Sequence, residues 1–78
     1  MAVVAVVDGY EVRVYTRDHP PPHTHVHKGS ARIKISLEPD IAYMSHKGPP
    51  TTRELRRAID IVAEHADACR ALWRQYHS

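Results

Sequence analysis

Apolar and polar residues alternate along the first part of the chain, and this alternation predicts a β-hairpin. Residues 3–7 are all apolar and mostly β-branched, Asp8-Gly9 is a common two-residue hairpin turn, and residues 10–16 alternate between apolar and polar side chains. A two-residue turn brings the apolar faces of both strands together. It predicts the cross-strand pairs Val7–Tyr10, Ala5–Val12 and Val3–Val14.

The same alternation returns in residues 23–37 and predicts a second hairpin, with Lys28-Gly29 as its turn. In this register the apolar side chains fall on one face and the ionisable side chains on the other, an arrangement that a slip of one residue destroys. The apolar face carries Val26, Ala31, Ile33, Ile35 and Leu37, and the pairs predicted on the ionisable face are His27–Ser30, His25–Arg32 and His23–Lys34.

Residues 51–77 show a different period, in which apolar side chains recur every three or four positions, and this predicts one long amphipathic helix. Thr51 and Glu54 have the spacing of a capping box, which marks a helix start. About 25 residues at about 1.5 Å each span about 38 Å, enough to cross a four-stranded sheet. Residues 38–50 are expected to form an irregular connection with a short extended piece at residues 41–45.

Together these elements predict one α+β domain over residues 1–78, with the order ββββα. The hairpins occupy residues 2–37, and the helix is expected to cover one face of the antiparallel sheet and leave the other accessible. A chain of 78 residues has room for only a thin core. Its 42% hydrophobic and 26% charged residues are typical of folded globular proteins and exclude the disordered class.

Charge and cysteine content narrow the protein class further. The net charge of +2 is too small by itself to indicate nucleic-acid binding. Cys69, the single cysteine, excludes an internal disulfide and a cysteine-based zinc site, and it is expected in the core, as is Trp73. The apolar start lacks a basic region and is too short for a signal peptide or a membrane span, so a cytoplasmic protein without membrane contact is expected.

Histidines concentrate in residues 18–29, which read D-H-P-P-P-H-T-H-V-H-K-G. His23, His25 and His27 alternate, so a strand presents their three imidazoles on one face. The preceding prolines are expected to form a stiff, extended approach, since each fixes φ and disfavours helix in the residue before it. We interpret this face as a site, and we expect His46, His65 and His77 to lie outside it.

One interpretation of the histidine face is a metal site, because neutral imidazoles bind zinc or nickel and alternate strand positions can converge on one ion. His23, His25 and His27 would be its ligands. Against this interpretation, the predicted register puts Arg32 and Lys34 opposite two of the histidines, and neighbouring cations oppose the binding of a dication. We therefore expect no metal cofactor and keep zinc or nickel as the alternative.

The favoured interpretation is a phosphate site with the equipment of a metal-independent ribonuclease. Histidines have a pKa of about 6.5, which suits them to take a proton from an attacking hydroxyl and to give one to a leaving oxygen. Arginine and lysine stabilise charge on the transferring phosphoryl group. The expected roles are acid and base for His23 and His25, orientation of a histidine by Asp18 or Glu11, phosphate binding by Arg32 and Lys34, and, if the two hairpins join, further contacts from Arg13 and Tyr15.

A second group of cations, Arg53, Arg56 and Arg57, lies in the first two turns of the predicted helix. The helix dipole disfavours positive charge there, which favours an anionic partner, so these arginines join the candidates for RNA binding. The alternative is a solvated helix start in which Arg56 pairs with Asp60 four residues on.

The motif Asp18-His19-x-Pro21-Pro22-His23-x-His25-Val26 resembles the core of a small bacterial family with a domain of unknown function. The resemblance covers nearly the whole chain and includes Gly9-Tyr10, Lys47-Gly48, Glu54-Leu55-Arg56 and Trp73. Members of that family are often encoded beside another small protein, and such pairs are commonly proposed as type II toxin-antitoxin modules. The resemblance implies a toxin-like role and a cognate antitoxin, with the role carried here by Asp18, His19, His23 and His25.

The function predicted from the sequence is therefore a toxin-like protein of a toxin-antitoxin system that binds RNA and cleaves it without a metal ion. Two alternatives stay open. One is a non-enzymatic module whose histidine face docks a protein partner or senses pH, and the other is a metal-binding protein built on the histidine cluster. RNA and a cognate antitoxin are the expected partners, and an apolar first strand at a sheet edge makes a homodimer plausible.

Overall fold

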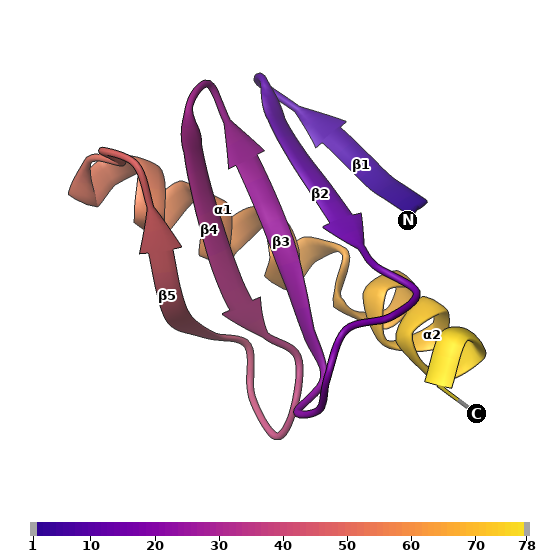
Figure 1. Ribbon diagram of the computed structural model, residues 1–78. Helices are drawn as coiled ribbons and strands as arrows, with labels where there is room; N and C mark the ends of the chain where they lie inside the picture. Colours follow the sequence, from indigo (N-terminus) through magenta and orange to yellow (C-terminus); the bar gives the residue numbers. More distant parts are fainter. Residues whose placement is uncertain (1, 78) are drawn as a thin grey trace.

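The computed structural model describes residues 2–77 as five strands followed by two helices (Figure 1). The strands form one antiparallel sheet in which each strand pairs with its neighbours in sequence, in the order β1-β2-β3-β4-β5. The elements are β1 (Ala2–Val7), β2 (Tyr10–Val14), β3 (His23–Lys28), β4 (Ala31–Ser36), β5 (Ala42–Lys47), α1 (Thr52–Glu64) and α2 (Ala66–His77). The predicted α+β class is confirmed, whereas the predictions of four strands and one helix are wrong.

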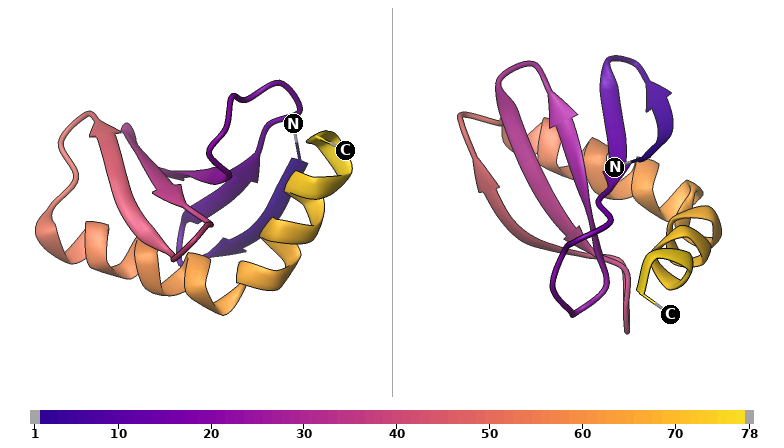
Figure 2. Two further views of the ribbon diagram at one scale, coloured as in Figure 1. Left: turned by 90° about the horizontal axis from the view of Figure 1, so that it is seen from below. Right: turned by 45° about the vertical axis from the view of Figure 1, so that its right-hand side comes forward.

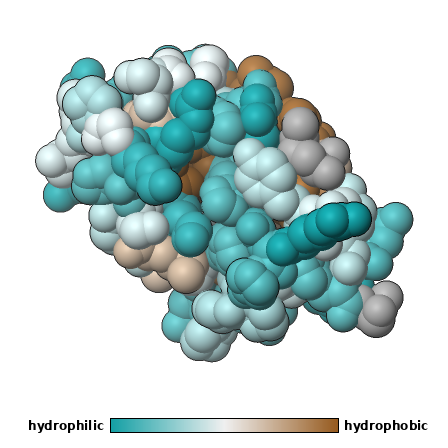
Figure 3. Space-filling view, in the orientation of Figure 1, coloured by the Kyte–Doolittle hydropathy of each residue, from teal (hydrophilic) through white to brown (hydrophobic). Residues whose placement is uncertain are grey.

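Both helices lie on one side of the sheet (Figure 2). α1 crosses behind the strands, and α2 lies beyond the end of β2, beside the loop that leads to β3. The buried side chains between the layers come from the inner faces of β2, β3 and β4 and from both helices. The opposite face of the sheet is open and largely hydrophilic, and apolar surface gathers on it along the β1 edge (Figure 3).

The first hairpin forms at the predicted turn. Asp8 and Gly9 have φ values of 50° and 79°, the two positive values that a type I′ turn requires. The pairs Val7–Tyr10 and Ala5–Val12 are confirmed, but Val3 pairs with Arg13 because the register shifts between Val3 and Ala5. An extra residue at a bulge reverses the faces beyond it, so Val4 packs on the core and Val3 is 47% exposed.

The second hairpin turns one residue later than predicted, at Gly29-Ser30. Gly29 has φ +56° and stands at the first central position, as a type II′ turn requires, whereas the predicted turn needs positive φ at a lysine. Each residue of β3 therefore pairs with the β4 residue two positions later than predicted, and side chains on a strand repeat their direction every two residues. The faces stay as predicted, but the pairs become His27–Arg32, His25–Lys34 and His23–Ser36.

The segment predicted to be an irregular connection contains the fifth strand, which overlaps the short extended piece predicted at residues 41–45. All six residues of β5 are exposed, so the strand has no buried face and no apolar period that would reveal it in the sequence. Its backbone pairs with β4, with Lys47 opposite Arg32 and Ser45 opposite Lys34. β5 thus forms one edge of the sheet and adds side chains to the open face.

The predicted capping box is confirmed, but the predicted helix breaks at His65. The amide of Glu54 donates to the Thr51 hydroxyl and the amide of Thr51 to the Glu54 carboxylate, at 3.0 and 2.8 Å. At the break, the His65 ring nitrogen Nδ1 binds the carbonyl of Ile61 at 2.9 Å, and the His65 amide turns to the carbonyl of Val62. A side chain has entered the hydrogen-bond ladder of the helix, which is a common cause of a kink.

Within residues 2–77, no helix is long and apolar enough to cross a bilayer.

Replacing Gly29 by alanine tests the position of the second turn. A Cβ at Gly29 meets nothing within 4 Å, so the only cost is the positive φ, and we expect a loss of about 1 kcal/mol in the free energy of unfolding. Ser30→Ala is the matched control, because Ser30 is exposed in the same turn without positive φ. Urea unfolding of the two variants measures the difference, and equal losses would contradict a Gly29-Ser30 turn.

The thiol of Cys69 is expected to resist modification in the folded protein. Cys69 is fully buried, and burial raises the pKa of its thiol to about 11, so the reactive thiolate is scarce at pH 8. A thiol-specific colorimetric reagent should react slowly with the native protein and rapidly in urea. Reaction of the native protein at the rate of a free thiol would show that the core between sheet and helices is open.

Candidate functional site

The loop between β2 and β3 carries Asp18 to the open face of the sheet. The predicted stiff, extended approach is wrong, because the chain bends at Pro20 and Pro21 before β3 begins. An extended segment would carry Asp18 away from the strand, whereas the bend turns it back toward β3. A hydrogen bond from the first residue of β3 holds the loop in place. The ring nitrogen Nδ1 of His23 donates to the carbonyl of Pro21 at 2.8 Å.

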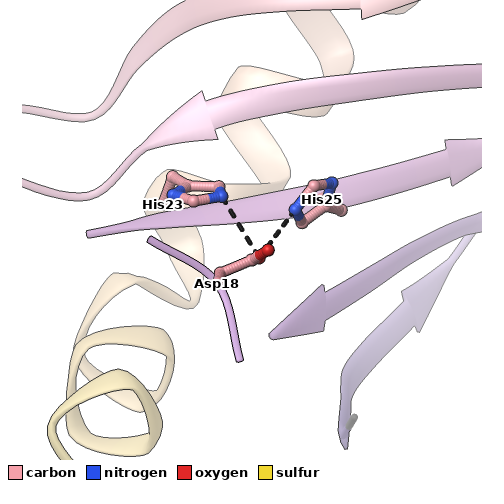
Figure 4. A group of neighbouring side chains, drawn as sticks. All are labelled: Asp18, His23 and His25. Carbon is pink, nitrogen blue, oxygen red and sulfur yellow. Dashed lines mark hydrogen bonds and ion pairs between the residues drawn. The ribbon is translucent and has the colours of Figure 1, made fainter. Parts of the chain in front are cut away.

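Asp18 lies between two of the predicted site histidines (Figure 4). One of its carboxylate oxygens, Oδ2, is 2.8 Å from Nε2 of His25 and 3.1 Å from Nε2 of His23. The three atoms all lie within 4.8 Å of one another. His23 and His25 point the same way because they are two residues apart on β3. Three of the four residues in the predicted catalytic set therefore meet at one point.

His23 is the buried member of this cluster. It is 4% exposed, and within the described chain its Nε2 has no hydrogen-bond partner, although Asp18 Oδ2 is close, because the pair lacks hydrogen-bond geometry. Since the carbonyl of Pro21 only accepts, Nδ1 holds the proton, and in a neutral ring Nε2 then holds a lone pair. Nε2 lies 3.1 Å from the carboxylate oxygen, and two electron-rich atoms at that distance repel each other unless a proton or a cation lies between them.

Two side chains of α2 support the cluster from behind. The ring of Trp73 lies 5.3 Å from that of His23, and His77 stacks on Trp73 with ring centres 3.8 Å apart and planes 12° apart. Nε2 of His77 lies 2.8 Å from the backbone carbonyl of Asp18. The final turn of the helix therefore fixes the loop that positions the carboxylate. The prediction that Trp73 belongs to the core is confirmed.

A groove of about 530 Å³ runs from the cluster across the open face toward β5. It contains three lysine or arginine side chains and three histidines but one carboxylate, that of Asp18, so its charge suits an anion. The hollow in the middle of Figure 3 lies on this face. The groove is lined by Tyr15, Asp18, His25, His27, Arg32, Ile33, Lys34, Ser45, His46 and Lys47.

The pairing of β2 with β3 joins the two hairpins and sets the charges around the histidines. Arg13 stands opposite His25 on one side and Lys34 opposite it on the other. Burial lowers the pKa of His25, while its hydrogen bond to Asp18 acts in the opposite direction. Burial, together with Arg13 and Arg32, also lowers the pKa of His27. Both imidazoles are therefore held toward their neutral forms.

The groove and its rim collect most of the predicted phosphate-binding residues. Tyr15 packs edge-on against His25, with ring centres 4.7 Å apart, and its hydroxyl lies 3.3 Å from Nε2 of His27. Arg32 donates to the carbonyls of Gly29 and Ala31, so its guanidinium is partly occupied. Arg13 forms an ion pair with Glu11 beside the groove. The Glu11 carboxylate therefore contacts an arginine, and not a histidine nitrogen as one of its predicted roles requires.

Other predicted residues lie apart from this cluster. His19 is exposed in the loop and lines neither the groove nor the Asp18 cluster. His27 is absent from the group of convergent ligand atoms, and Asp18 takes the place predicted for it in a metal site. The helix arginines border a separate hollow on α1, where Arg57 pairs with Asp8 at 3.1 Å. The ion pairs of residues 2–77 do not include the predicted alternative, Arg56 with Asp60.

The sequence interpretation missed two contributions to the site. Ser45, His46 and Lys47 line the groove from β5, and the polar alternation of Ser45 and Lys47 was their only signal. His77 was expected to lie outside the site, because no periodicity shows that the last helical turn returns to the β2–β3 loop. Both omissions concern contacts between segments that are distant in sequence.

The cluster offers two kinds of chemistry. Two imidazole nitrogens and a carboxylate oxygen form a common donor set for divalent transition metals. The pair of Asp18 and His25 is also a carboxylate-oriented histidine, which can accept a proton at its other ring nitrogen. In the described chain, Nδ1 of His25 makes no hydrogen bond, and the side chain borders the groove.

Comparison with known proteins adds a family but no activity. No curated protein and no solved structure matches the chain. A family model, the domain of unknown function DUF4160, matches residues 9–74, which include the whole cluster, every residue that lines the groove and every buried residue of the core. The chain therefore belongs to the DUF4160 family.

Proposed function

We propose that this protein binds RNA along the groove and cleaves it beside His25 without a metal ion. The carrying observation is the groove itself, in which six cationic or imidazole side chains surround one carboxylate that is already paired with His25. A phosphodiester chain supplies the complementary negative charge, and its affinity for such a surface comes mainly from phosphate contacts. The groove is lined from β3, β4 and β5, and the helices cover the opposite face of this sheet (Figure 2).

RNA fits this surface better than duplex DNA does. The tyrosine ring of Tyr15 stands at the groove beside His25, where an unpaired base can stack on it. Single-stranded RNA has accessible bases, and its 2′-hydroxyl provides an internal nucleophile beside each phosphate. With such a nucleophile, cleavage can proceed without the activation of a water molecule.

In the proposed reaction, the 2′-hydroxyl oxygen attacks the adjacent phosphorus and the bond from phosphorus to the 5′-oxygen breaks. Nδ1 of His25 takes the hydroxyl proton, while Nε2–H of the same ring donates to Asp18, which stabilises the imidazolium that forms. Lys34, directly opposite His25, stabilises the developing charge on phosphate. The departing 5′-oxygen takes a proton from the water of the open groove, and a 2′,3′-cyclic phosphate remains.

The two predicted catalytic histidines differ in access to a substrate. The side chain of His25 is 22% exposed and borders the groove, whereas that of His23 is 5% exposed and faces Asp18. Access favours His25 as the residue that touches RNA and His23 as a residue that acts through Asp18. RNA binding without any cleavage would favour the alternative of a non-enzymatic module.

The resemblance of the motif supports a toxin-like role with a cognate antitoxin, and a cytoplasmic location stays part of the proposal. A positively charged groove is a natural target for an acidic antitoxin segment, which would compete with RNA for the same cations.

A homodimer is a further proposal, supported by β1, an edge strand without charged residues whose Val3 and Val6 are 47% and 64% exposed. Pairing through this edge would leave the groove open.

Replacing groove lysines should weaken RNA binding in proportion to the number of phosphates that each lysine neutralises. For Lys34→Ala and Lys47→Ala, we expect the slope of log affinity against log salt concentration to fall by about 0.7 each with single-stranded RNA. Arg74→Ala, which removes an exposed cation on α2 outside the groove, is the charge-matched control. Fluorescence anisotropy over a salt series measures the slopes, and equal effects of all three substitutions would contradict binding in the groove.

Replacing His25 by alanine should separate cleavage from binding. Loss of the base is expected to lower the cleavage rate at least about 100-fold, while RNA affinity changes little because the lysines remain. The assay uses a labelled RNA in excess chelator, with circular dichroism to verify the fold. Unchanged cleavage by the purified variant would rule out His25 as the base, and loss of all wild-type cleavage in chelator would rule out the metal-free reaction.

A further inference from the structure

The buried nitrogen of His23 is left without a role by the proposed proton transfer. Its Nε2 is inaccessible and lacks a hydrogen-bond partner in the described chain, yet it faces Asp18 Oδ2 at 3.1 Å. A buried polar atom without a partner costs about 1–3 kcal/mol. An electron-pair acceptor placed between His23, His25 and Asp18 would remove this cost.

We infer that Asp18, His23 and His25 form a binding site for a divalent transition-metal ion of the Zn²⁺ class, and that the bound ion switches off RNA cleavage. The first part depends only on the geometry of the cluster. The second part rests on the proposed RNA cleavage, because it states how one site serves two ligands.

The distances suit such an ion. Two ligand atoms at about 2.1 Å from a tetrahedral ion are about 3.4 Å apart. The carboxylate oxygen of Asp18 lies 2.8 and 3.1 Å from the two imidazole nitrogens, and all three atoms lie within 4.8 Å of one another. Asp18 is on a loop and about a quarter exposed, so it can move back from the two nitrogens. The longest separation is that between the two imidazole nitrogens, and a rotation of the partly exposed His25 side chain shortens it.

The surroundings of His23 are those of a metal ligand. Metal-bound histidines almost always donate their second ring N–H to a carbonyl or carboxylate, which fixes the ring and its tautomer. His23 donates Nδ1–H to the carbonyl of Pro21 at 2.8 Å and packs against Trp73. Its Nε2 therefore lies within 4.8 Å of the other two ligand atoms before any ion arrives. Only the carboxylate and His25 need to adjust.

The flanking charges make this a reversible site. Arg13 and Lys34 stand opposite His25 on its two neighbouring strands, and both repel a dication. Three protein ligands also leave a coordination position open on the groove side, where Asp18 and His25 line the groove. An ion held in this way exchanges with solution and does not serve as a permanent part of the fold.

The switch follows from the tautomers of His25, because RNA cleavage and metal binding need opposite protonation of its two ring nitrogens. In the proposed cleavage, Nε2 of His25 carries the proton that Asp18 accepts, and Nδ1 carries the lone pair that takes the hydroxyl proton. An ion on Nε2 requires the other tautomer, with the proton on Nδ1. The base is then blocked, and the carboxylate that would stabilise the imidazolium is bound to the ion.

Metal titration of the untagged full-length protein tests the site. After removal of metal with a chelator and dialysis, Zn²⁺ binding is followed by calorimetry, and Co²⁺ binding by its visible absorption, which reports a tetrahedral site with nitrogen ligands. We expect one ion per chain at the strongest site. Asp18→Asn and His23→Ala should each lower the Zn²⁺ affinity at least about tenfold.

His27→Ala is the matched control for the metal titration. It removes a histidine from the same face of β3 that lies outside the convergent cluster, so the Zn²⁺ affinity should stay unchanged. If His23→Ala fails to fold, Asp18→Asn decides, because it replaces a partly exposed side chain with one of equal size. Absence of stoichiometric binding, or an equal loss in His27→Ala, would overturn the site.

RNA cleavage by the wild-type protein tests the switch. Cleavage should proceed in excess chelator, decline as Zn²⁺ occupies the site with the affinity found by calorimetry, and return when chelator is added. Cleavage that persists at full occupancy would overturn the switch and leave the proposed function standing. Cleavage that requires the ion would overturn both the switch and the metal-free reaction, while the metal site would remain.

Discussion

The open face of the sheet depends on one constraint, the burial of the other face of β3. Thr24 and Val26 are fully buried, with Val26 packed in the core that the helices cover, and the Thr24 hydroxyl donates to the carbonyl of Arg13 at 2.6 Å. A shift of one residue would carry an imidazole into this core, so the strand is fixed in register and in rotation. The side chains of His25 and His27 consequently lie on the open face, and the neighbouring strands set Arg13 and Lys34 on the two sides of His25.

The sequence predicts the features that follow from the spacing of apolar residues, and it does not predict local irregularities or contacts between distant segments. The alternation in β3 and β4 gives the correct faces even though the turn moved to Gly29-Ser30, because the register error equals the strand period. The bulge near Val3, by contrast, reverses a face, and no feature of an all-valine and alanine strand marks where the extra residue falls. Only a short extended piece at residues 41–45 was predicted for β5, because the strand has no buried side and no apolar period marks its extent. The helix break at His65 escaped prediction because an imidazole that binds a carbonyl leaves the apolar period intact.

The site combines local and distant contributions in the same way. The motif alone places His23 and His25 on one face, since their spacing on a strand suffices. Asp18 enters the cluster because the loop bends at the prolines and because His77, far along the chain, holds the Asp18 carbonyl. The stack of His77 on Trp73, and the contact of Trp73 with His23, join the last helical turn to the cluster. Substitutions in α2 can therefore disturb the site without touching any ligand, and measurements on site variants require a parallel measure of folding.

Competition between a phosphodiester and a metal ion follows from charge. A phosphate near His25 gains from Arg13 and Lys34, whereas a dication in the cluster loses from both, and each interaction is worth about 1 kcal/mol at 4 Å in water and more where water is excluded. Asp18 has the opposite effect, because it attracts the ion and repels phosphate. The carboxylate of Asp18 cannot hold a metal ion and also accept the hydrogen bond from Nε2 of His25 during proton transfer. The same three residues therefore support one ligand at a time. The concentrations of free metal ion and of RNA, each relative to its affinity, decide which ligand is bound.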